Sequence, residues 1–372
     1  MTEEELATEV GPMIDSCVHY QWDSQMEVFE YLSAGSREYY GRPGLLPGGR
    51  GMASLLPPIS YHPPGGRWLP QPGGPEAVSP ATSPLSLVSE YLEPAQVERA
   101  VLVFADASRA TCLPNGPFAL ELAQAINRWT SERWLSGQDA RLYGSILAPL
   151  QLPEEAAAEI RRAAADPRMA AIIVSGNPLG RPFGHNIYAP IHAAAAELGL
   201  PIVVVAGGDL PPNTPSHPTA GGYPSTFSEF YLLRAQALMT HLVSFIAGGV
   251  LERYRDLKVV MLGGGAGWVA PFVGRANEAA LAYAPWEAPW LRRAVPEQVR
   301  DQVRFCTYTS GPMLAGGAEA EIALEFQDSL VFGSGYPCWD SDDAAELARS
   351  IPPQARSGIF RETALDSYRW PN

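Results

Sequence analysis

Hydrophobic runs alternate with amphipathic stretches along most of the chain, from about residue 97 onward. Short runs of apolar and β-branched residues are typical of buried strands, whereas apolar positions three and four residues apart are typical of helices. The sequence predicts strands over 13–15, 101–104, 142–147, 171–174, 201–205, 259–262, 303–308 and 330–332. It predicts helices over 117–134, 153–165, 187–198 and 228–254.

The order of these elements indicates the fold class. Strands that are apolar along their whole length and separated by helices favour a parallel sheet covered on both faces. Eight such units favour a closed (β/α)8 TIM barrel, and a doubly wound open sheet is the alternative. We expect one domain over residues 1–372.

Residues 41–84 interrupt the pattern directly after the first strand. Roughly half of them are Gly or Pro, which excludes regular helix or central strand. A loop of this length inside a domain is often functional. We therefore expect a Gly/Pro-rich insertion that acts either as a lid or as a passive surface wrap.

Composition and charge exclude several classes of protein. The chain is 46% hydrophobic and 18% charged, which is ordinary for a globular protein, and its net charge of −14 argues against nucleic acid as a partner. We predict no membrane partner, because runs of about 20 apolar residues are all interrupted by charge, Gly or Pro. The acidic N-terminus lacks the pattern of a signal peptide, and the four cysteines form no CxxC pair, so we expect a cytoplasmic protein.

The carboxyl ends of the strands carry the candidate chemistry, because a TIM barrel places its active site there. Four segments are informative: Ile-Asp-Ser-Cys-Val-His at 14–19, Glu-Leu-Gly-Leu-Pro at 197–201, Gly-Val-Leu-Glu-Arg-Tyr at 249–254 and Phe-Gly-Ser-Gly-Tyr-Pro at 332–337. In these segments the chain resembles the amidohydrolase-related family, which includes the aminocarboxymuconate-semialdehyde decarboxylase-like lyases.

The resemblance implies a divalent metal, which the family holds with a pair on strand one, a His ending strand five and an Asp on strand eight; a His or Glu commonly joins from strand six. The corresponding residues here are Cys17 with His19, Val205, Gly335 and Gly263. Val and Gly side chains offer no electron pair, and a catalytic Zn²⁺ needs about three protein ligands. We therefore expect no metal and no other cofactor, and a mouth widened by the two glycines.

Five residues at strand ends are candidates for catalysis. We predict His19, Asp106 and His185 as proton carriers. Cys17 lies two residues from His19, on the same face of the strand, and is a candidate nucleophile or polar wall. Asp15 could act as a base or orient a neighbour. The alternatives are packed barrel residues for Asp15, Cys17 and His19, a helix N-cap for Asp106 and an exposed loop position for His185.

Substrate contacts are predicted from aromatic and polar residues near the same strand ends. The candidates are Tyr231, Tyr308, Tyr336 and Trp339 as an aromatic wall, with Asn177 and His217 as polar contacts. We expect the mid-helix residues His192 and His241 to be packing residues, and Asp340, Asp342 and Asp343 to form a solvated helix start.

These observations favour an enzyme of amidohydrolase descent that performs acid/base chemistry without a metal on a small organic molecule, as in lyase, decarboxylation, dehydration or cyclisation steps of specialised biosynthesis. One alternative is a metal-dependent hydrolase or decarboxylase with a rearranged site that adds His185 or His217 to Cys17 and His19. Another is a non-catalytic homologue that binds a ligand or a partner. The resemblance also implies a homo-oligomer.

Overall fold

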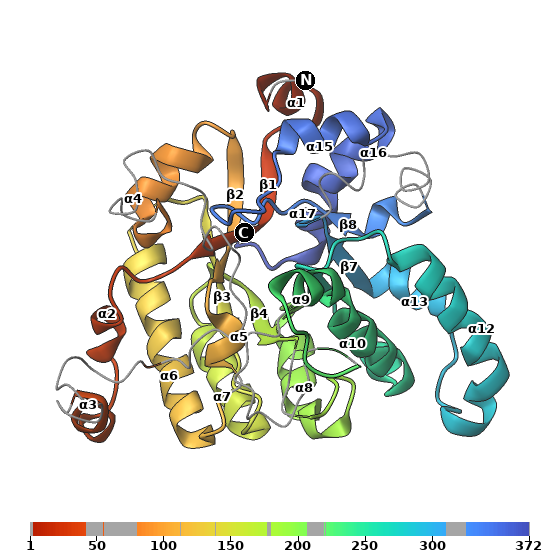
Figure 1. Ribbon diagram of the computed structural model, residues 1–372, viewed down its shortest axis with the longest axis horizontal. Coiled ribbons are helices and arrows are strands. Elements are labelled where there is room, and N and C mark those ends of the chain that lie inside the picture. Colours follow the sequence, from red (N-terminus) through yellow and green to blue (C-terminus); the bar gives the residue numbers. More distant parts are fainter. Residues whose placement is uncertain are drawn as a thin grey trace.

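Eight parallel strands form the centre of the structure (Figure 1). The computed structural model describes residues 3–41, 55, 80–111, 113–137, 139–176, 180–206, 219, 221–309 and 325–371. The strands pair in chain order: β1 (Met13–Tyr20), β2 (Val97–Phe104), β3 (Leu142–Leu147), β4 (Met169–Ser175), β5 (Ile202–Val205), β6 (Val259–Leu262), β7 (Val303–Cys306) and β8 (Leu330–Val331).

Backbone hydrogen bonds between β1 and the chain that follows β8 close the sheet. The amide of Ser16 donates to the carbonyl of Phe332 at 2.9 Å, and the amide of His19 donates to the carbonyl of Tyr336 at 2.7 Å. The amide of Gly335 donates back to the carbonyl of Cys17 at 2.9 Å. The predicted (β/α)8 barrel is therefore confirmed, and the open-sheet alternative is excluded.

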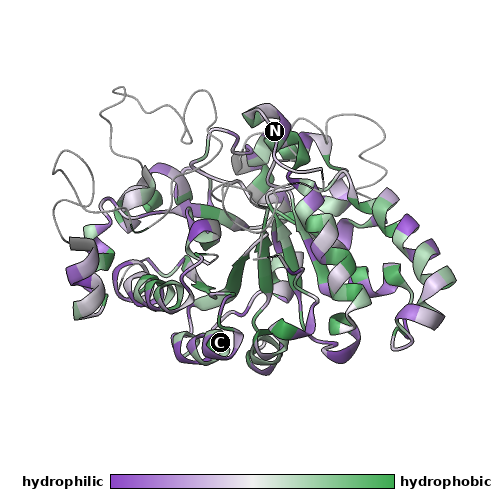
Figure 2. Ribbon diagram, turned by 60° about the horizontal axis from the view of Figure 1, so that its bottom comes forward, coloured by the Kyte–Doolittle hydropathy of each residue, from purple (hydrophilic) through white to green (hydrophobic). Residues whose placement is uncertain are grey.

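Helices surround the strands, with their polar sides turned outward (Figure 2). They are α1 (Glu3–Val10), α2 (Met26–Phe29), α3 (Ala34–Gly41), α4 (Pro84–Leu87), α5 (Ala107–Ala110), α6 (Gly116–Trp129), α7 (Pro153–Ala163), α8 (Ala189–Leu198), α9 (Phe227–Leu233), α10 (Ala235–Ala247), α11 (Val250–Arg253), α12 (Val269–Glu287), α13 (Val295–Gln302), α15 (Ala344–Ser350), α16 (Pro353–Ser357) and α17 (Thr363–Ser367). A π-helical turn, Thr130–Leu135, extends α6 to the end of the predicted helix 117–134.

The predicted helix 228–254 is divided into α9, α10 and α11. A turn of Gly248 and Gly249 separates α10 from α11, and Gly249 has a φ of +71°. This left-handed conformation is accessible to glycine at little cost and ends a helix. The helix pair α9–α10 therefore stops before residue 248, and a short separate helix leads into β6.

Alternation along β1 decides which of its side chains point into the barrel. Tyr20 points outward: its ring stacks on Trp129 at 5.8 Å, and its hydroxyl shares a 2.6 Å hydrogen bond with Oγ1 of Thr130. Successive side chains of a strand point to opposite faces. The preceding residue, His19, therefore points into the barrel, where it is 4% exposed.

Most of the Gly/Pro-rich insertion over 41–84 lies outside the described residues. Two of its described positions lie close to the carboxyl end of β1. The amide of Leu55 donates to Oε1 of Gln25 at 3.1 Å, and the carbonyl of Ala81 accepts from the amide of Gln21 at 2.9 Å. The chain thus leaves and rejoins the barrel near the carboxyl end of β1, and a lid at this position stays a prediction.

One helical stretch in the described part of the chain, Phe227–Ala247, is long and apolar enough to cross a membrane. It carries Glu229 and Arg234, and core helices of water-soluble proteins pass the same test of length and composition. The absence of a membrane partner stays a prediction.

Candidate active site

Asp15 lies at the centre of a hydrogen-bond network that joins β1 to the segment after β8. Its carboxylate accepts from the amides of Cys17 at 2.9 Å and Ser334 at 3.0 Å, from Oγ of Ser334 at 2.6 Å, and from the hydroxyl of Tyr91 at 2.5 Å. Burial raises the pKa of Asp15, and these hydrogen bonds offset part of that rise. Since its oxygens are engaged in this way, Asp15 holds the closure of the barrel in place.

Cys17 and His19 lie side by side within the barrel. The Sγ atom of Cys17 is 3.7 Å from Nε2 of His19, and both residues are buried. Burial raises the pKa of the Cys17 thiol well above its usual value, and Cys306 and Asp15 add to the rise. The thiolate is the nucleophilic form of cysteine. Cys17 therefore fits a polar wall beside His19 better than the predicted nucleophile.

Tyr308 connects His19 to an acidic residue at the barrel mouth. Its ring meets the His19 ring edge-on at 5.7 Å, and its hydroxyl donates to Oδ1 of Asp340 at 2.8 Å. The side chain of Asp340 is 8% exposed, so the prediction that it belongs to a solvated helix start is wrong. The prediction is confirmed for Asp343, which caps α15 by accepting from the amide of Glu346 at 2.7 Å.

Arg234 faces Asp340 from the junction of α9 and α10. Its Nη1 atom is 3.7 Å from Oδ2 of Asp340, and its guanidinium carbon lies 5.4 Å from the centre of the Tyr231 ring. A Cβ atom on Gly263, at the end of β6, would lie 3.1 Å from Nη2 of Arg234. The guanidinium therefore lies against the position of strand six at which the resemblance implies a His or Glu.

Other side chains fill the space that Gly263 and Gly335 were expected to leave open at the barrel mouth. A Cβ atom on Gly335 would lie 2.0 Å from Cε2 of Tyr308, and Arg234 covers Gly263. The predicted widening of the mouth at these positions is therefore wrong. It fails because a tyrosine ring and a guanidinium from other elements pack onto the bare backbone.

The donor set does not fit the divalent metal that the resemblance implies. Only Cys17 and His19 offer donors at the family positions, because Val205, Gly263 and Gly335 offer none. Cys17 is moreover held as a thiol, and the positive charge of Arg234 lies beside the same strand ends. Among the residues that the structure describes, no three His, Cys, Asp or Glu side chains are grouped to hold a metal ion.

The predicted aromatic wall divides into two parts. Tyr231 and Trp339 contact each other with ring centres 5.5 Å apart, and Arg234 and Asp340 connect them to Tyr308. Tyr336 is directed elsewhere and stacks on Tyr91 at 4.2 Å, next to Asp15. Burial raises the pKa of both Tyr231 and Tyr336 to about 12, which keeps both hydroxyls neutral at physiological pH.

Asp106 and His185 each have a partner close by in the chain. Asp106 precedes α5 and forms an ion pair with Arg109 in the first turn of that helix. His185 is exposed, where its Nδ1 accepts from the amide of Ile187 at 3.1 Å and its Nε2 lies 3.1 Å from Nη1 of Arg181. His185 thus lies at an exposed loop position, and Asp106 stands at the N-cap position of α5 without a capping hydrogen bond from its side chain. A catalytic role for either residue stays a prediction.

Two predicted substrate contacts, Asn177 and His217, lie outside the described residues. The mid-helix histidines lie where the sequence predicts, because both His192 and His241 are buried. Nδ1 of His241 accepts from the amide of Phe183 at 3.2 Å, and its Nε2 lies 2.8 Å from the carbonyl of Gly176. His241 thus fastens the loop after β4 to α10.

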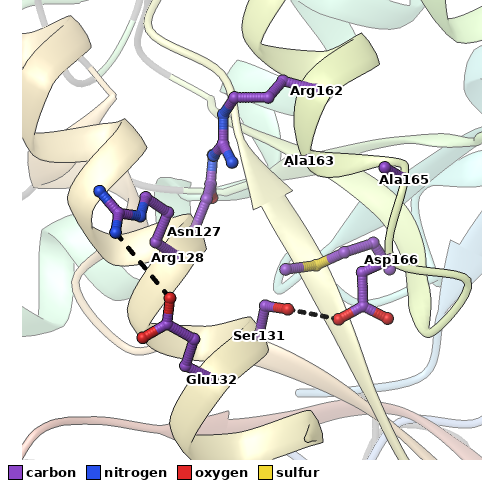
Figure 3. Close-up of a pocket in the computed structure, with 9 residues that line it drawn as sticks. Asn127, Arg128, Ser131, Glu132, Arg162, Ala163, Ala165 and Asp166 are labelled. Atoms are coloured by element: carbon purple, nitrogen blue, oxygen red, sulfur yellow. Dashed lines mark hydrogen bonds and ion pairs between the residues drawn. The ribbon is translucent and has the colours of Figure 1, made fainter.

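Hollows also lie outside the group around His19, and two of them border α7 and α8. One of about 230 Å³ lies between α6 and α7, where Ser131 donates to Asp166 at 2.5 Å and Arg128 approaches Glu132 at 3.9 Å (Figure 3). Its wall includes Met169 at the amino end of β4, the end of a TIM barrel associated with stability. The other, of about 790 Å³, is lined in part by His185, His192 and Trp290.

The sequence pattern alone did not single out Arg234, Ser334 or Tyr91. Arg234 had a usable signal, because it is a charge within the apolar helical stretch 228–254. Tyr91 had none, since its contact with Asp15 spans 76 positions of the chain.

The match to a family model establishes the relationship of this chain. The amidohydrolase model matches residues 90–370, so the chain belongs to that family. A comparison with curated proteins finds no match.

Solved structures share the fold along nearly the whole chain. An amidohydrolase from Mycobacterium avium subsp. paratuberculosis K-10 has a TM-score of 0.70 and 18% identity, with 95% of this chain and 98% of that one covered. The 5-carboxyvanillate decarboxylase of Novosphingobium aromaticivorans DSM 12444, solved with manganese and a nitrobenzoic acid, has a TM-score of 0.65 and 14% identity, with 95% and 94% covered. A dihydroxybenzoic acid decarboxylase from Polaromonas sp. JS666, solved with manganese and 2-nitroresorcinol, has a TM-score of 0.61 and 15% identity, with 95% and 96% covered.

Proposed function

We propose that this protein is an enzyme that acts on a small organic molecule by proton transfer at the barrel mouth, without a catalytic metal. The observation that carries the proposal is the replacement of the family's ligand positions: Arg234 lies against Gly263, and the Tyr308 ring lies against Gly335. A tyrosine and a guanidinium do not form a divalent-metal site, whereas His19, beside them, is suited to general acid/base catalysis.

The reaction class proposed is lyase-type, with decarboxylation as its first candidate. The support is the shared fold with decarboxylases of hydroxylated benzoic acids. In such a step the bond to the carboxyl carbon breaks, carbon dioxide leaves, and the electron pair remaining on the substrate carbon takes up a proton. Nε2 of His19 is the proton carrier in this proposal, and the neutral Tyr308, whose ring meets the His19 ring edge-on, packs beside it.

A cytoplasmic location and a homo-oligomeric assembly are part of the proposal. The location is supported by Cys17, Cys306 and Cys338, which are buried free thiols in the described part of the chain. Such thiols are typical of proteins in reducing compartments.

The test combines metal analysis with turnover of 5-carboxyvanillate and 2,6-dihydroxybenzoate, two acids named in the structural relatives. We expect purified protein to carry far less than one equivalent of Zn or Mn, and turnover to survive EDTA. The His19→Gln variant should lose about 100-fold or more of that rate, a usual loss for a general acid/base. Stoichiometric metal with EDTA-sensitive turnover would favour the metal-dependent alternative. Absence of turnover of either acid would refute decarboxylation of these acids and favour the non-catalytic alternative.

A further inference from the structure

The second half of α12 carries large apolar side chains into solvent. The helix spans 19 residues, and its buried residues, Val269 and Val273, both lie in its first turns. In its last turns Leu281 is 73% exposed, Tyr283 61% and Trp286 85%. The helix lies at the outer edge of the molecule, on the right in Figure 1. Exposed apolar side chains gathered on one element are typical of a surface that binds another macromolecule.

One row of exposed residues follows the side of α12 that is turned away from Val273. An α-helix turns by about 100° per residue, so positions four, three and four residues apart stay on one face. The exposed residues at this spacing are Arg275, Ala279, Ala282 and Trp286, which we call the α12 stripe. The stripe therefore has a cation at one end, an aromatic ring at the other, and two small side chains between them.

The α12 stripe is complementary to a second copy of itself that runs in the opposite direction. Around a two-fold axis that passes between residues 280 and 281, Arg275 of one copy lies opposite Trp286 of the other. The same axis places Ala279 opposite Ala282, where small side chains let the two backbones approach. A guanidinium over an indole ring is a favourable cation–π contact, and the symmetry forms it twice. The two barrels lie on opposite sides of the helix pair and do not collide.

The polar and aromatic groups of the α12 stripe are not engaged within their own chain. In the part of the chain that the structure describes, the guanidinium of Arg275 has no hydrogen bond or ion pair, and the Trp286 ring has no ring contact. Glu278 follows Arg275 at a spacing that permits an ion pair in a helix, yet the two do not pair. Both groups of the cation–π contact are therefore available to a second copy.

The length of α12 fits a small two-fold interface. Nineteen helical residues span about 28 Å. Two such helices packed along their length, with Leu281 and Tyr283 at the sides, bury on the order of 1,000 Å² in total, the lower end for a specific interface. We therefore expect a dimer that dissociates at micromolar concentrations and not an obligate one.

We propose that the α12 stripe is the interface of a homodimer in which the α12 helices of two copies pack antiparallel. This goes beyond the proposed catalysis, and it gives the homo-oligomeric assembly stated with that proposal a definite surface. The occupant is a second copy of this chain, because the row of side chains is complementary to itself in charge and in size.

Sedimentation velocity at protein concentrations from about 1 to about 100 μM tests the proposal. We expect the mass of the wild-type protein to rise from the 40.1 kDa of one chain toward twice that value. Trp286→Arg places two arginines opposite each other and should raise the dissociation constant at least tenfold. A monomer at every concentration, or a dimer that Trp286→Arg leaves intact, would overturn the proposal.

A compensating double variant tests the antiparallel register. Arg275→Glu combined with Trp286→Arg places a glutamate of each copy opposite an arginine of the other. The double variant should dimerise at least tenfold more tightly than Trp286→Arg alone, because repulsion is replaced by two ion pairs. Failure to recover the dimer would overturn the proposal, since an apolar contact without this register is insensitive to the exchange.

Leu85→Arg is the matched control. Leu85 is 78% exposed and lies on α4, at the other edge of the molecule in Figure 1. The variant introduces the same side chain outside the α12 stripe, so its dimerisation should equal that of the wild type. Equal weakening by Leu85→Arg and Trp286→Arg would show a non-specific effect of added charge and would also overturn the proposal.

The outcome is separable from that of the proposed function. EDTA-resistant turnover by a protein that stays monomeric would refute the α12 interface alone. Conversely, a dimer that responds to these variants as expected keeps the interface, even if metal analysis and turnover refute the metal-independent mechanism.

Discussion

A single backbone position, residue 335, shows why this chain cannot regain the family's acidic ligand by one substitution. Gly335 has a φ of +72°, a conformation that side chains rarely adopt, and the Tyr308 ring occupies the place of its missing Cβ atom. A left-handed backbone costs a residue with a side chain about 1–2 kcal/mol, and overpacking costs about 1–3 kcal/mol more. The tyrosine and the glycine therefore depend on each other.

We predict that Gly335→Ala lowers the free energy of unfolding by about 2–5 kcal/mol, measured by urea titration. Gly137→Ala is the matched control, because Gly137 has a φ of +71° and none of the described residues has an atom within 4 Å of the added Cβ. This control variant has the cost of the left-handed backbone without a clash like that with the Tyr308 ring. Its free energy of unfolding should therefore fall by less. Equal losses of unfolding free energy in the two variants would show that the Tyr308 ring moves aside at little cost.

A second prediction at this scale concerns His241, whose pKa is lowered by burial to about 4. Its unfolded-state value is near 6.5, so the unfolded chain binds more protons between these two pH values. The stability contributed by neutral His241 is present above pH 6.5 and is lost as the pH falls through 4. Protonation of Nδ1 would also break its hydrogen bond with the amide of Phe183.

We therefore expect His241→Gln to flatten the pH dependence of stability. The wild-type protein should lose about 2 kcal/mol more of its unfolding free energy between pH 7 and pH 5 than the variant does. Urea denaturation at several pH values measures how the unfolding free energy of each protein changes with pH. Burial also lowers the pKa of His192 to about 4. His192 is present in both proteins, so its contribution to the pH dependence cancels in the comparison. The same pH dependence of the unfolding free energy in both proteins would contradict the prediction.

At the scale of elements, the strands could be predicted and the helix breaks could not. The apolar runs 142–147 and 259–262 coincide with β3 and β6, because strands buried on both faces need continuous hydrophobicity. The predicted helix 228–254 is equally apolar, yet it is divided where Gly249 turns left-handed. Local alternation along β1 was enough to predict that Cys17 and His19 share a face. It could not predict contacts between distant elements, such as that of Arg234 with Asp340.

We predict that the cap of α9 supports the position of Arg234. The side chain of Thr226 accepts from the amide of Glu229 at 3.2 Å, and Glu229 accepts in return from the amide of Thr226 at 3.3 Å. Thr226→Ala should cost about 1 kcal/mol of stability, because the helix that leads into Arg234 loses its anchored start. Thermal unfolding measures this loss.

Asn115→Ala provides the matched control for this prediction. Asn115 caps α6 by accepting from the amide of Phe118 at 3.2 Å, and α6 carries none of the residues around Arg234. Its loss should cost a similar stability. If Asn115→Ala lowers the unfolding temperature and Thr226→Ala does not, the cap of α9 does not stabilise the protein.

At the scale of the whole molecule, one continuous core and the closure between β1 and the segment after β8 hold the barrel together. The charges of the mouth are part of this arrangement, because Arg234, Asp340 and Tyr308 join elements that are far apart in the chain. The homo-oligomer implied by the resemblance stays a prediction. Light scattering of the purified protein checks it, with a mass above the 40.1 kDa of one chain as the supporting result.

The thermal stability of the whole molecule provides an independent test of metal binding that needs no substrate. A ligand that binds only the folded state at 100 times its dissociation constant stabilises that state by about 2.7 kcal/mol. We therefore predict that dialysis against EDTA, and the later addition of excess Zn²⁺ or Mn²⁺, leave the unfolding temperature unchanged. The guanidinium of Arg234 already supplies the positive charge at the ends of β5 and β6, so a cation placed there would be repelled. A loss of several degrees after EDTA, reversed by one of these metals, would contradict the prediction.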